Sequence, residues 1–390
     1  MATPRKVVIL GATGSIGTSA LKILRQYPED LQLVGIAANQ RFPELAAIAT
    51  EFQVPACVIF EETAFQAARQ SGLFPTETRL SCGPEGLLEL VAAPDLDIVL
   101  AAMVGTAALF PALAAIEGGK TIALANKEIL VMAGEFITRK AQESGSLLLP
   151  TDSEHNAIFQ CLEGARQDFS EVEKLILTAS GGPFRNSSLE AMQAVRLADA
   201  LKHPNWDMGP KVTLDSATMA NKGLELIEAR WLFGVPAGQL DVVVHPQSIV
   251  HSMVQYVDGS ILAQLSPPSM TFSIQHCLLY PERKPGVEAT LDFREALQLD
   301  FEPPDLSRFA SLRLAMESLE TGGTAPCVFN AANEVAVHAF TQEKIGFLQI
   351  PWVIDKTLEK TNISEPSSLD VVLESDREAR AIADRFIDSL

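Results

Sequence analysis

The chain has 390 residues, which exceeds the roughly 250–300 residues at which a single hydrophobic core stops growing, so more than one domain is expected. Hydrophobic residues make up 47% of the chain and charged residues 20%, a composition that excludes wholesale disorder. The formal net charge of −19 argues against nucleic acid or an anionic membrane as a partner held by bulk charge.

The first 150 residues alternate short β-branched apolar runs with amphipathic helical stretches, such as 15–26 and 44–52. This alternation predicts a parallel sheet covered by helices, that is, a doubly wound, Rossmann-type α/β domain over 1–150. The expected strands are 6–10, 33–38, 56–60, 97–101, 121–125 and 147–149.

Residues 98–116 carry no charge and are numerous enough to raise the question of a membrane span. Gly105 and Pro111 interrupt this stretch, and its composition changes from β-branched to alanine-rich after Thr106. We therefore expect a buried strand, a tight turn and a helix, and no membrane segment. The cysteine spacing indicates neither disulfides nor zinc, and the N-terminus leaves no room for a signal peptide, so we expect a cytoplasmic protein.

Three further parts are expected after residue 150: an α+β catalytic domain over 151–280, a proline-rich linker over 281–305 and a helical domain over 306–390. The expected antiparallel sheet of the catalytic domain has strands at 174–178, 240–244, 252–257 and 261–265, beside a long helix near 220–233. The expected tail helices are 307–320, 328–340, 349–360 and 369–390. Residues 286–390 hold nine basic and nineteen acidic residues, so over half of the net charge lies there.

A glycine-rich turn, Gly11–Gly17, follows the first strand and precedes a helix. Such glycines let the backbone approach a pyrophosphate, and the N–H groups of the helix start receive its charge. The second strand ends without the acidic residue typical of an NAD site and is followed by Arg41, which favours NADP. A polar cluster, Asn126–Glu128, stands at the carboxyl end of another strand, where ligands of such sheets bind. The alternative for this cluster is a helix start with a solvated lysine.

Two acidic residues, Asp152 and Glu154, follow an apolar run, and in an extended segment both point to the same side. Like charges this close are unfavourable without a cation between them, and oxygen ligands suggest Mg²⁺ or Mn²⁺. The simpler alternative is a helix N-cap with capping acids near Asn156.

A third carboxylate stands on the helix near 220–233, where Glu225 lies one turn after Asn221. Ser216, Asn221 and Lys222 offer a hydroxyl, an amide and an ammonium that suit a phosphate group. Glu228 is a rival metal ligand that spacing alone does not exclude.

Two loops complete the predicted site, Ala179–Phe184 and His203–Gly209. The first loop contains a Gly-Gly-Pro sequence, and the second contains the apolar Trp206 and Met208. This composition predicts a movable lid that would exclude water from the site. The alternatives are a flexible surface loop and a buried tryptophan.

These strings together resemble the 1-deoxy-D-xylulose 5-phosphate reductoisomerase family over essentially the whole chain. The motifs that carry the resemblance are Gly11–Gly17, Ala125–Glu128, Thr151–His155, Ser180–Phe184, His203–Gly209, Asp215–Phe233, His245–Ser248 with His251, Asp258–Ser260 and Asn330–Glu334. The resemblance implies an NADPH-dependent enzyme that converts 1-deoxy-D-xylulose 5-phosphate to 2-C-methyl-D-erythritol 4-phosphate in isoprenoid synthesis. It also implies a divalent cation, a homodimer and inhibition by a phosphonate hydroxamate.

The resemblance further implies roles for individual residues. The catalytic residues would be Lys127 and the three metal ligands Asp152, Glu154 and Glu225. The substrate would contact Lys127, Ser153, Glu154, Ser180, His203, Trp206, Ser216, Asn221, Lys222 and Glu225. The cofactor would contact Thr13, Gly14, Ser15, Ile16, Asn126, Glu128 and Gly209. Trp206 and Met208 match the lid.

One departure concerns the 2′-phosphate, because relatives commonly read Ala-Gly-(Lys/Arg)-Asn where this chain has Ala38–Arg41. The basic residue is displaced by one, so Asn39, Gln40 and Arg41 remain candidates for this contact. Skeletal rearrangement by retro-aldol cleavage or by a direct ketol shift fits the residues equally. Alternative functions are an NADP-dependent dehydrogenase of the homoserine or semialdehyde type and a cofactor-binding regulator.

Overall fold

The computed structural model describes residues 3–166, 169–203, 205, 206 and 208–390, and the chain divides into two compact units. Unit 1 comprises Met1–Ile129, Phe136–Asn156 and Ser269–Thr290. Unit 2 comprises Leu130–Glu135, Ala157–Pro268 and Leu291–Leu390. Both units are therefore built from separated stretches of sequence, whereas the predicted domains were consecutive along the chain.

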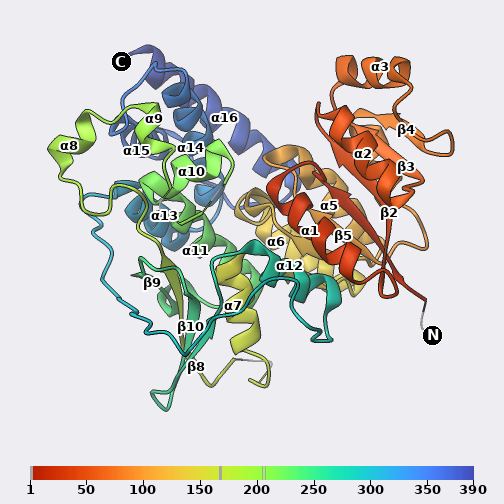
Figure 1. The fold of residues 1–390 in the computed structure, drawn as a ribbon. Helices are drawn as coiled ribbons and strands as arrows, with labels where there is room; N and C mark the ends of the chain where they lie inside the picture. Colours follow the sequence, from red (N-terminus) through yellow and green to blue (C-terminus); the bar gives the residue numbers. More distant parts are fainter. Residues whose placement is uncertain (1–2, 167–168, 204, 207) are drawn as a thin grey trace. The chain divides into compact units, whose positions relative to one another are not determined.

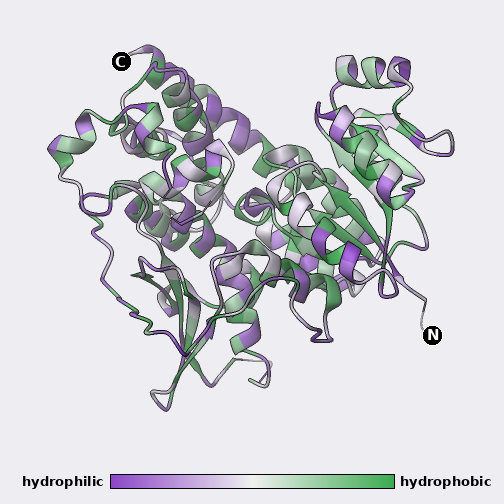
Figure 2. Ribbon diagram, in the orientation of Figure 1, coloured by the Kyte–Doolittle hydropathy of each residue, from purple (hydrophilic) through white to green (hydrophobic). Residues whose placement is uncertain are grey.

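Unit 1 is built on a parallel sheet that has seven strands among the described residues, in the order β4-β3-β2-β1-β5-β6-β7 (Figure 1). The strands are β1 (Arg5–Leu10), β2 (Leu31–Ala38), β3 (Ala56–Ile59), β4 (Arg79–Cys82), β5 (Ile98–Ala101), β6 (Thr121–Leu124) and β7 (Leu148–Pro150). Their central residues are buried and apolar, which Figure 2 shows as green arrows in β1 and β2. The strand order reverses at β1, which lies between β2 and β5, and such a reversal is where ligands bind in these sheets.

The expected doubly wound fold and its six expected strands are confirmed, with ends shifted by one or two residues. The edge strand β4 was missed because its sequence, Arg-Leu-Ser-Cys, has no β-branched residue and little alternation. Residues 98–116 fold as predicted into β5, the 3₁₀ turn η1 (Thr106–Ala108) and α5 (Leu109–Glu117). Among the described residues, no helix combines the length and the apolar character needed to cross a membrane.

The helices of the unit 1 sheet include one from much later in the chain. The early helices are α1 (Ser15–Gln26), α2 (Phe42–Phe52), α3 (Glu62–Ser71), α4 (Gly83–Val91) and α6 (Lys127–Ser144). The late helix, α12 (Met270–Leu279), packs beside α1 (Figure 1). The Arg5 guanidinium joins the two parts by donating to the carbonyls of Leu278 and Tyr280, at 2.6 and 2.8 Å. The first residues of the expected linker therefore belong to unit 1.

Unit 2 contains a four-stranded sheet, counted over the described residues, in the order β11-β10-β8-β9. Its strands are β8 (Val172–Ala179), β9 (Leu240–Val244), β10 (Val250–Tyr256) and β11 (Ile261–Leu265). The prediction of an antiparallel sheet is confirmed for β10, which is antiparallel to both of its neighbours, and is wrong for β8 and β9, which run parallel. The long helical connection between β8 and β9 supplies the crossover that a parallel pair needs.

The C-terminal helices share one core with this sheet. The helices before the linker are α7 (Ser153–Cys161), which begins in unit 1, α8 (Leu189–Gln193), α9 (Leu197–Ala200), α10 (Pro210–Thr218), α11 (Ala220–Phe233) and the 3₁₀ turn η2 (Ala237–Gln239). Those after it are α13 (Ala310–Thr321), α14 (Ala325–Thr341), α15 (Gln349–Lys360) and α16 (Leu369–Asp388). Leu224 of α11, Leu312 of α13 and Phe329 of α14 belong to one buried cluster. The tail therefore packs as part of unit 2, although the sequence suggested a separate helical domain.

Candidate functional site

The glycine turn of unit 1 is held tightly against its neighbours. A Cβ on Gly11, which has φ +96°, would lie 2.6 Å from the carbonyl oxygen of Ala102 at the end of β5. A Cβ on Gly17 would lie 2.4 Å from the carbonyl oxygen of Ala12. These two glycines bring the turn and the start of α1 close to the sheet edge, where the first N–H groups of α1 have no intrahelical partner. The predicted contacts Thr13, Gly14, Ser15 and Ile16 all lie at this helix start.

The candidates for the 2′-phosphate contact lie at the end of β2. Arg41 comes next to the turn, because its guanidinium donates to the carbonyl of Thr13. Asn39 and Gln40 are exposed. The structure thus joins two predicted cofactor contacts, Thr13 and Arg41, that are distant in the sequence.

Asn126 is a helix cap whose amide is used internally. Its Oδ1 accepts from the N–H of Ile129 at 3.0 Å, and its Nδ2 donates to the carbonyls of Met103 and Gly105, the latter at 2.9 Å. The side chain therefore fixes the loop after β5 to the start of α6. The alternative of a helix start at this cluster is confirmed, and an asparagine before a helix is a common cap. The neighbouring Glu128 is buried.

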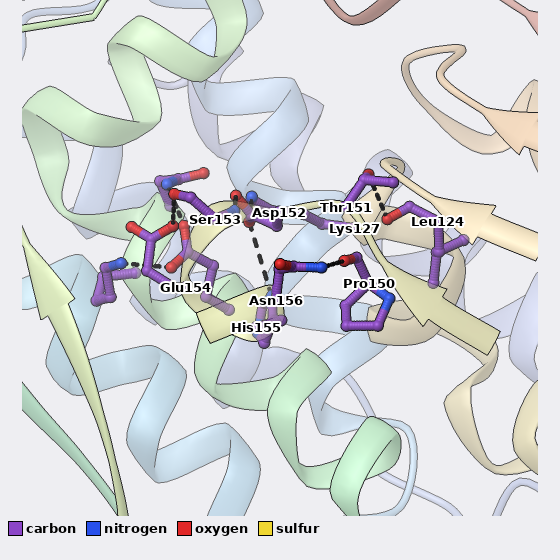
Figure 3. Close-up of polar contacts among 12 residues, drawn as sticks. Leu124, Lys127, Pro150, Thr151, Asp152, Ser153, Glu154, His155 and Asn156 are labelled. Carbon is purple, nitrogen blue, oxygen red and sulfur yellow. Dashed lines mark hydrogen bonds and ion pairs between the residues drawn. The ribbon is translucent and has the colours of Figure 1, made fainter. Parts of the chain in front are cut away.

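A cluster of charged side chains lies where β7 passes into α7, also within unit 1 (Figure 3). Figure 3 shows the Lys127 side chain directed at Asp152, and their ammonium and carboxylate form an ion pair with side chains only 15% and 13% exposed. Ser153 Oγ donates to a Glu154 carboxylate oxygen at 2.6 Å. Asp152 and Glu154 offer oxygens within 4.8 Å of each other, a spacing suited to one cation.

The expected extended geometry of this segment is wrong, because α7 begins at Ser153 and Glu154 lies in its first turn. Asp152 accepts from the N–H of Ser153 at 3.0 Å, so the helix-capping alternative describes part of its role. Asn156 also contributes locally, donating to the Pro150 carbonyl at 2.9 Å (Figure 3). The two carboxylates still converge, but the helix start rather than strand alternation brings them together.

Ser180 and His203 of unit 2 lie side by side, with Ser180 Oγ 3.0 Å from His203 Nε2. The backbone N–H groups of Asn205 and Trp206 donate to His203 Nδ1 at 3.2 and 2.9 Å. Since Nδ1 accepts, the neutral ring carries its proton on Nε2 and donates to Ser180 Oγ. Burial lowers the pKa of His203, which favours this neutral form.

The loop that carries Trp206 is attached to the His245–Ser248 motif. Asn205 Nδ2 donates to the Pro246 carbonyl at 2.6 Å and to Ser248 Oγ at 3.0 Å. The ring of Trp206 stands 6.2 Å from that of His251. Sequence reasoning assigned no role to Asn205, and no local pattern could have revealed a contact across forty residues. Met208 and Gly209 follow, with Gly209 at the N-cap of α10, whereas Pro204 and Asp207 of the motif lie outside the described residues.

The predicted phosphate-binding residues of unit 2 stand at the corner between α10 and α11. Met219, with φ +60°, separates Ser216 in the last turn of α10 from Asn221 and Lys222 in the first turn of α11. Asn221 Nδ2 donates to Glu225 at 2.5 Å, as the i, i+4 spacing predicted, and the buried Lys222 ammonium pairs with the same carboxylate. Glu228, the rival ligand, is buried one turn further along α11.

Gly182 closes this corner from the other side. Its φ is +66°, and a Cβ there would lie 2.6 Å from the Ser216 carbonyl oxygen. The loop after Ser180 therefore packs directly against the end of α10. The predicted substrate contacts of unit 2 thus gather at one place, while the predicted metal ligands are divided between unit 1, with Asp152 and Glu154, and unit 2, with Glu225.

Three family models match the chain. The model described as 1-deoxy-D-xylulose 5-phosphate reductoisomerase matches residues 7–134, the one described as the C-terminal domain of that enzyme matches 148–233, and the DXP reductoisomerase C-terminal domain matches 265–382. The reductoisomerases of Cellvibrio japonicus and Ralstonia nicotianae are 46% and 48% identical to this chain, each alignment covering 98% of both proteins. The chain belongs to the 1-deoxy-D-xylulose 5-phosphate reductoisomerase family.

Solved structures of the family share the whole fold. The Zymomonas mobilis reductoisomerase in complex with NADPH superposes with a TM-score of 0.92 at 45% identity, covering 99% of this chain and 100% of that one. A DOX-P reductoisomerase in complex with NADPH, fosmidomycin and magnesium also gives 0.92, at 41% identity over 98% of each chain. The resemblance inferred from the ordered motifs is therefore confirmed at the level of family and fold.

Proposed function

We propose that this protein converts 1-deoxy-D-xylulose 5-phosphate to 2-C-methyl-D-erythritol 4-phosphate with NADPH. The observation that carries the proposal is the likeness, at 45% identity and over nearly the full length, to a reductoisomerase bound to NADPH. The clustered polar residues in each unit agree with it. A simple dehydrogenase of the homoserine type would not need the convergent carboxylates of Asp152 and Glu154. A cofactor-binding regulator would have no enzymatic activity to lose when these carboxylates are substituted.

We assign the cofactor to unit 1. The start of α1 lies close to the turn after β1, where the glycines allow a pyrophosphate to approach the backbone and the first N–H groups of the helix. The Arg41 guanidinium lies beside this turn, so it is the candidate for the 2′-phosphate among the three residues after β2. Glu128 and Asn126 complete the proposed cofactor contacts of unit 1, and Gly209, at the N-cap of α10 in unit 2, is the one proposed contact outside it.

We assign a divalent cation, Mg²⁺ or Mn²⁺, to Asp152, Glu154 and Glu225. The donor set fits such an ion, because all three ligands are carboxylates and two already offer oxygens within 4.8 Å of each other. The ion would act as a Lewis acid toward the oxygens of the substrate. Lys127 neutralises Asp152 and orients it, and Ser153 does the same for Glu154 by donating a hydrogen bond.

We assign the phosphate group of the substrate to the α10–α11 corner. Ser180 accepts from His203 and from the Gly182 N–H, at 3.0 and 3.2 Å, so its own proton is available for an outward hydrogen bond. Ser216, Asn221 and Lys222 would supply the remaining donors. Trp206 and Met208 would cover the bound substrate and exclude water from the hydride transfer.

We further propose a homodimer that forms at the β11 edge of the unit 2 sheet. β11 pairs with β10 on one side, and Ile261 and Leu262 of this strand are 51% and 50% exposed. Val257, in the turn before it, is 63% exposed. Exposed apolar edge strands can pair with another chain.

We also propose a cytoplasmic location. The five cysteines are free thiols, which agrees with it.

The decisive experiment measures the loss of NADPH absorbance with 1-deoxy-D-xylulose 5-phosphate and Mg²⁺ or Mn²⁺, together with product identification. The expected product has a branched skeleton, and an unbranched product or no turnover by folded protein would contradict the proposal. Glu225→Gln and Glu228→Gln form a matched pair on one helix. We expect the first to raise the Mn²⁺ concentration needed for activity and to lower turnover far more than the second; the reverse order would make Glu228 the ligand.

A further inference from the structure

The Asn330–Glu334 motif places two amide side chains inside the helical core of unit 2. Asn330 and Asn333 on α14 are both fully buried. A buried amide destabilises a core unless it forms hydrogen bonds. Asn333 Nδ2 donates at 2.8 Å to Oδ1 of Asp215 on α10, which lies 118 positions earlier in the chain.

Asp215 is itself a buried charge, with a side chain that is 1% exposed. Its other oxygen lies 3.0 Å from Nζ of Lys211, one turn earlier on the same helix. The ammonium and the amide together compensate the carboxylate, as a buried ion requires. The next residue, Ser216, is a proposed donor to the substrate phosphate. Asn333 therefore fixes the last turn of α10 at the point where that helix reaches the phosphate.

The C-terminal helices also hold the other arm of the corner. A Cβ on Gly223, the residue after Lys222, would lie 2.3 Å from Cβ of Ala315 on α13. α11 therefore packs on α13 so closely that no Cβ fits at position 223. Arg380 of α16 donates to Glu334 of α14 at 2.6 Å and so fixes α14 itself.

We infer that Asn333 is a positioning residue for the phosphate group of the substrate. It acts through Asp215, which holds Ser216 and the α10–α11 corner in the geometry that receives the phosphate. The inference rests on the proposed function and gives the C-terminal helices a part in substrate recognition, without any contact to the substrate.

The test compares Asn333→Ala with Asn330→Ala in the full-length protein. Both positions are fully buried asparagines on α14, but Asn330 Nδ2 contacts Glu334 of its own helix, at 3.4 Å. We expect Asn333→Ala to raise the KM for 1-deoxy-D-xylulose 5-phosphate about tenfold, since a hydrogen bond to a charged group is lost and the corner shifts. The KM for NADPH should change less than about twofold by the same reasoning, because the proposed contacts of its pyrophosphate and 2′-phosphate belong to unit 1, and kcat should change by a smaller factor than the substrate KM. Asn330→Ala should leave all three near the wild-type values.

An exchange of the two groups supplies the rescue. In Asp215→Asn combined with Asn333→Asp, the new amide at 215 can donate to the new carboxylate at 333, so the substrate KM should return toward wild type, while Asp215→Asn alone stays impaired. Equal KM increases in Asn333→Ala and Asn330→Ala, or no rescue by the exchange, would overturn the inference. If Asn333→Ala does not fold, Asn333→Ser takes its place with the same expectations. Wild-type protein that does not turn over this substrate would overturn the proposed function instead.

Discussion

Gly17 is the position where the smallest change should disturb the cofactor turn most. An added Cβ would lie 2.4 Å from the carbonyl oxygen of Ala12, 2.6 Å from its carbonyl carbon and 2.7 Å from its Cα. Ordinary contact begins at 3.4 Å, so the two backbone segments would have to separate by about 1 Å. All three contacted atoms belong to backbone, which cannot rotate away as the end of a side chain can.

The expected cost of Gly17→Ala follows from this overlap. Overpacking of a tight contact destabilises by about 1–3 kcal/mol, so about 2 kcal/mol is a reasonable expectation. For a unit of this size that lowers the midpoint of thermal unfolding by about 4–8 °C. The displaced helix start should also weaken NADPH binding, because its N–H groups no longer converge on the pyrophosphate.

Gly14→Ala is the matched control in the same turn. Gly14 has an ordinary φ of −80°, and a Cβ there would lie 3.4 Å from the Gly11 carbonyl oxygen, without overlap. The ligand-free protein should therefore melt like wild type, while the new methyl group would still block the approach of the pyrophosphate and weaken NADPH binding. Thermal melts and NADPH fluorescence titrations separate the two effects. A Gly17→Ala protein as stable as wild type, or unchanged NADPH affinity in Gly14→Ala, would refute the reasoning.

Lys222→Ala should raise the substrate KM about tenfold or more in steady-state kinetics and leave the NADPH affinity unchanged, because the ammonium is assigned to the substrate phosphate. An equal loss of affinity for substrate and for NADPH would contradict this assignment. Arg41→Ala should narrow the preference for NADPH over NADH, and an unchanged ratio would move the 2′-phosphate contact to Asn39 or Gln40. Burial lowers the pKa of His203 in the folded protein below its usual 6.5. As the pH falls through 6.5, the unfolded chain therefore binds a proton at this residue more readily than the folded protein does, and the folded protein loses stability. The free energy of unfolding, measured by chemical denaturation, should therefore fall more between pH 7.5 and pH 5.5 in wild type than in His203→Gln.

The parallel sheet of unit 1 could be predicted because its strands are buried on both faces and read as apolar runs. Strand β4 escaped because Arg79–Cys82 lies at the sheet edge, where burial imposes no such pattern. The parallel orientation of β9 relative to β8 was also not predicted, because the sequence of a strand does not indicate which neighbour the strand pairs with. The position of 269–290 in unit 1 depends on long-range contacts such as that of Arg5 with Tyr280, which leave no local signal.

The candidate site was predictable where its residues share one helix. Asn221 and Glu225 meet because their i, i+4 spacing requires it. The convergence of Asp152 with Glu154 was predicted, but from the wrong geometry, because a helix start and a strand both place these carboxylates together. Asn205 and Asn333 could not be assigned from sequence, as their partners Ser248 and Asp215 lie far along the chain.

The charge of the chain bears on its ligands only through local groups. Of the net charge of −19, over half lies in 286–390, whereas the proposed phosphate groups meet Arg41, Lys222 and helix starts. The Lys222 ammonium is paired with Glu225, and both side chains are at most 5% exposed. In such a buried pair the carboxylate opposes the approach of a phosphate that the ammonium favours. A divalent cation at Glu225 would offset that carboxylate and leave the ammonium to the phosphate, so under the proposed ligand set each should strengthen the binding of the other.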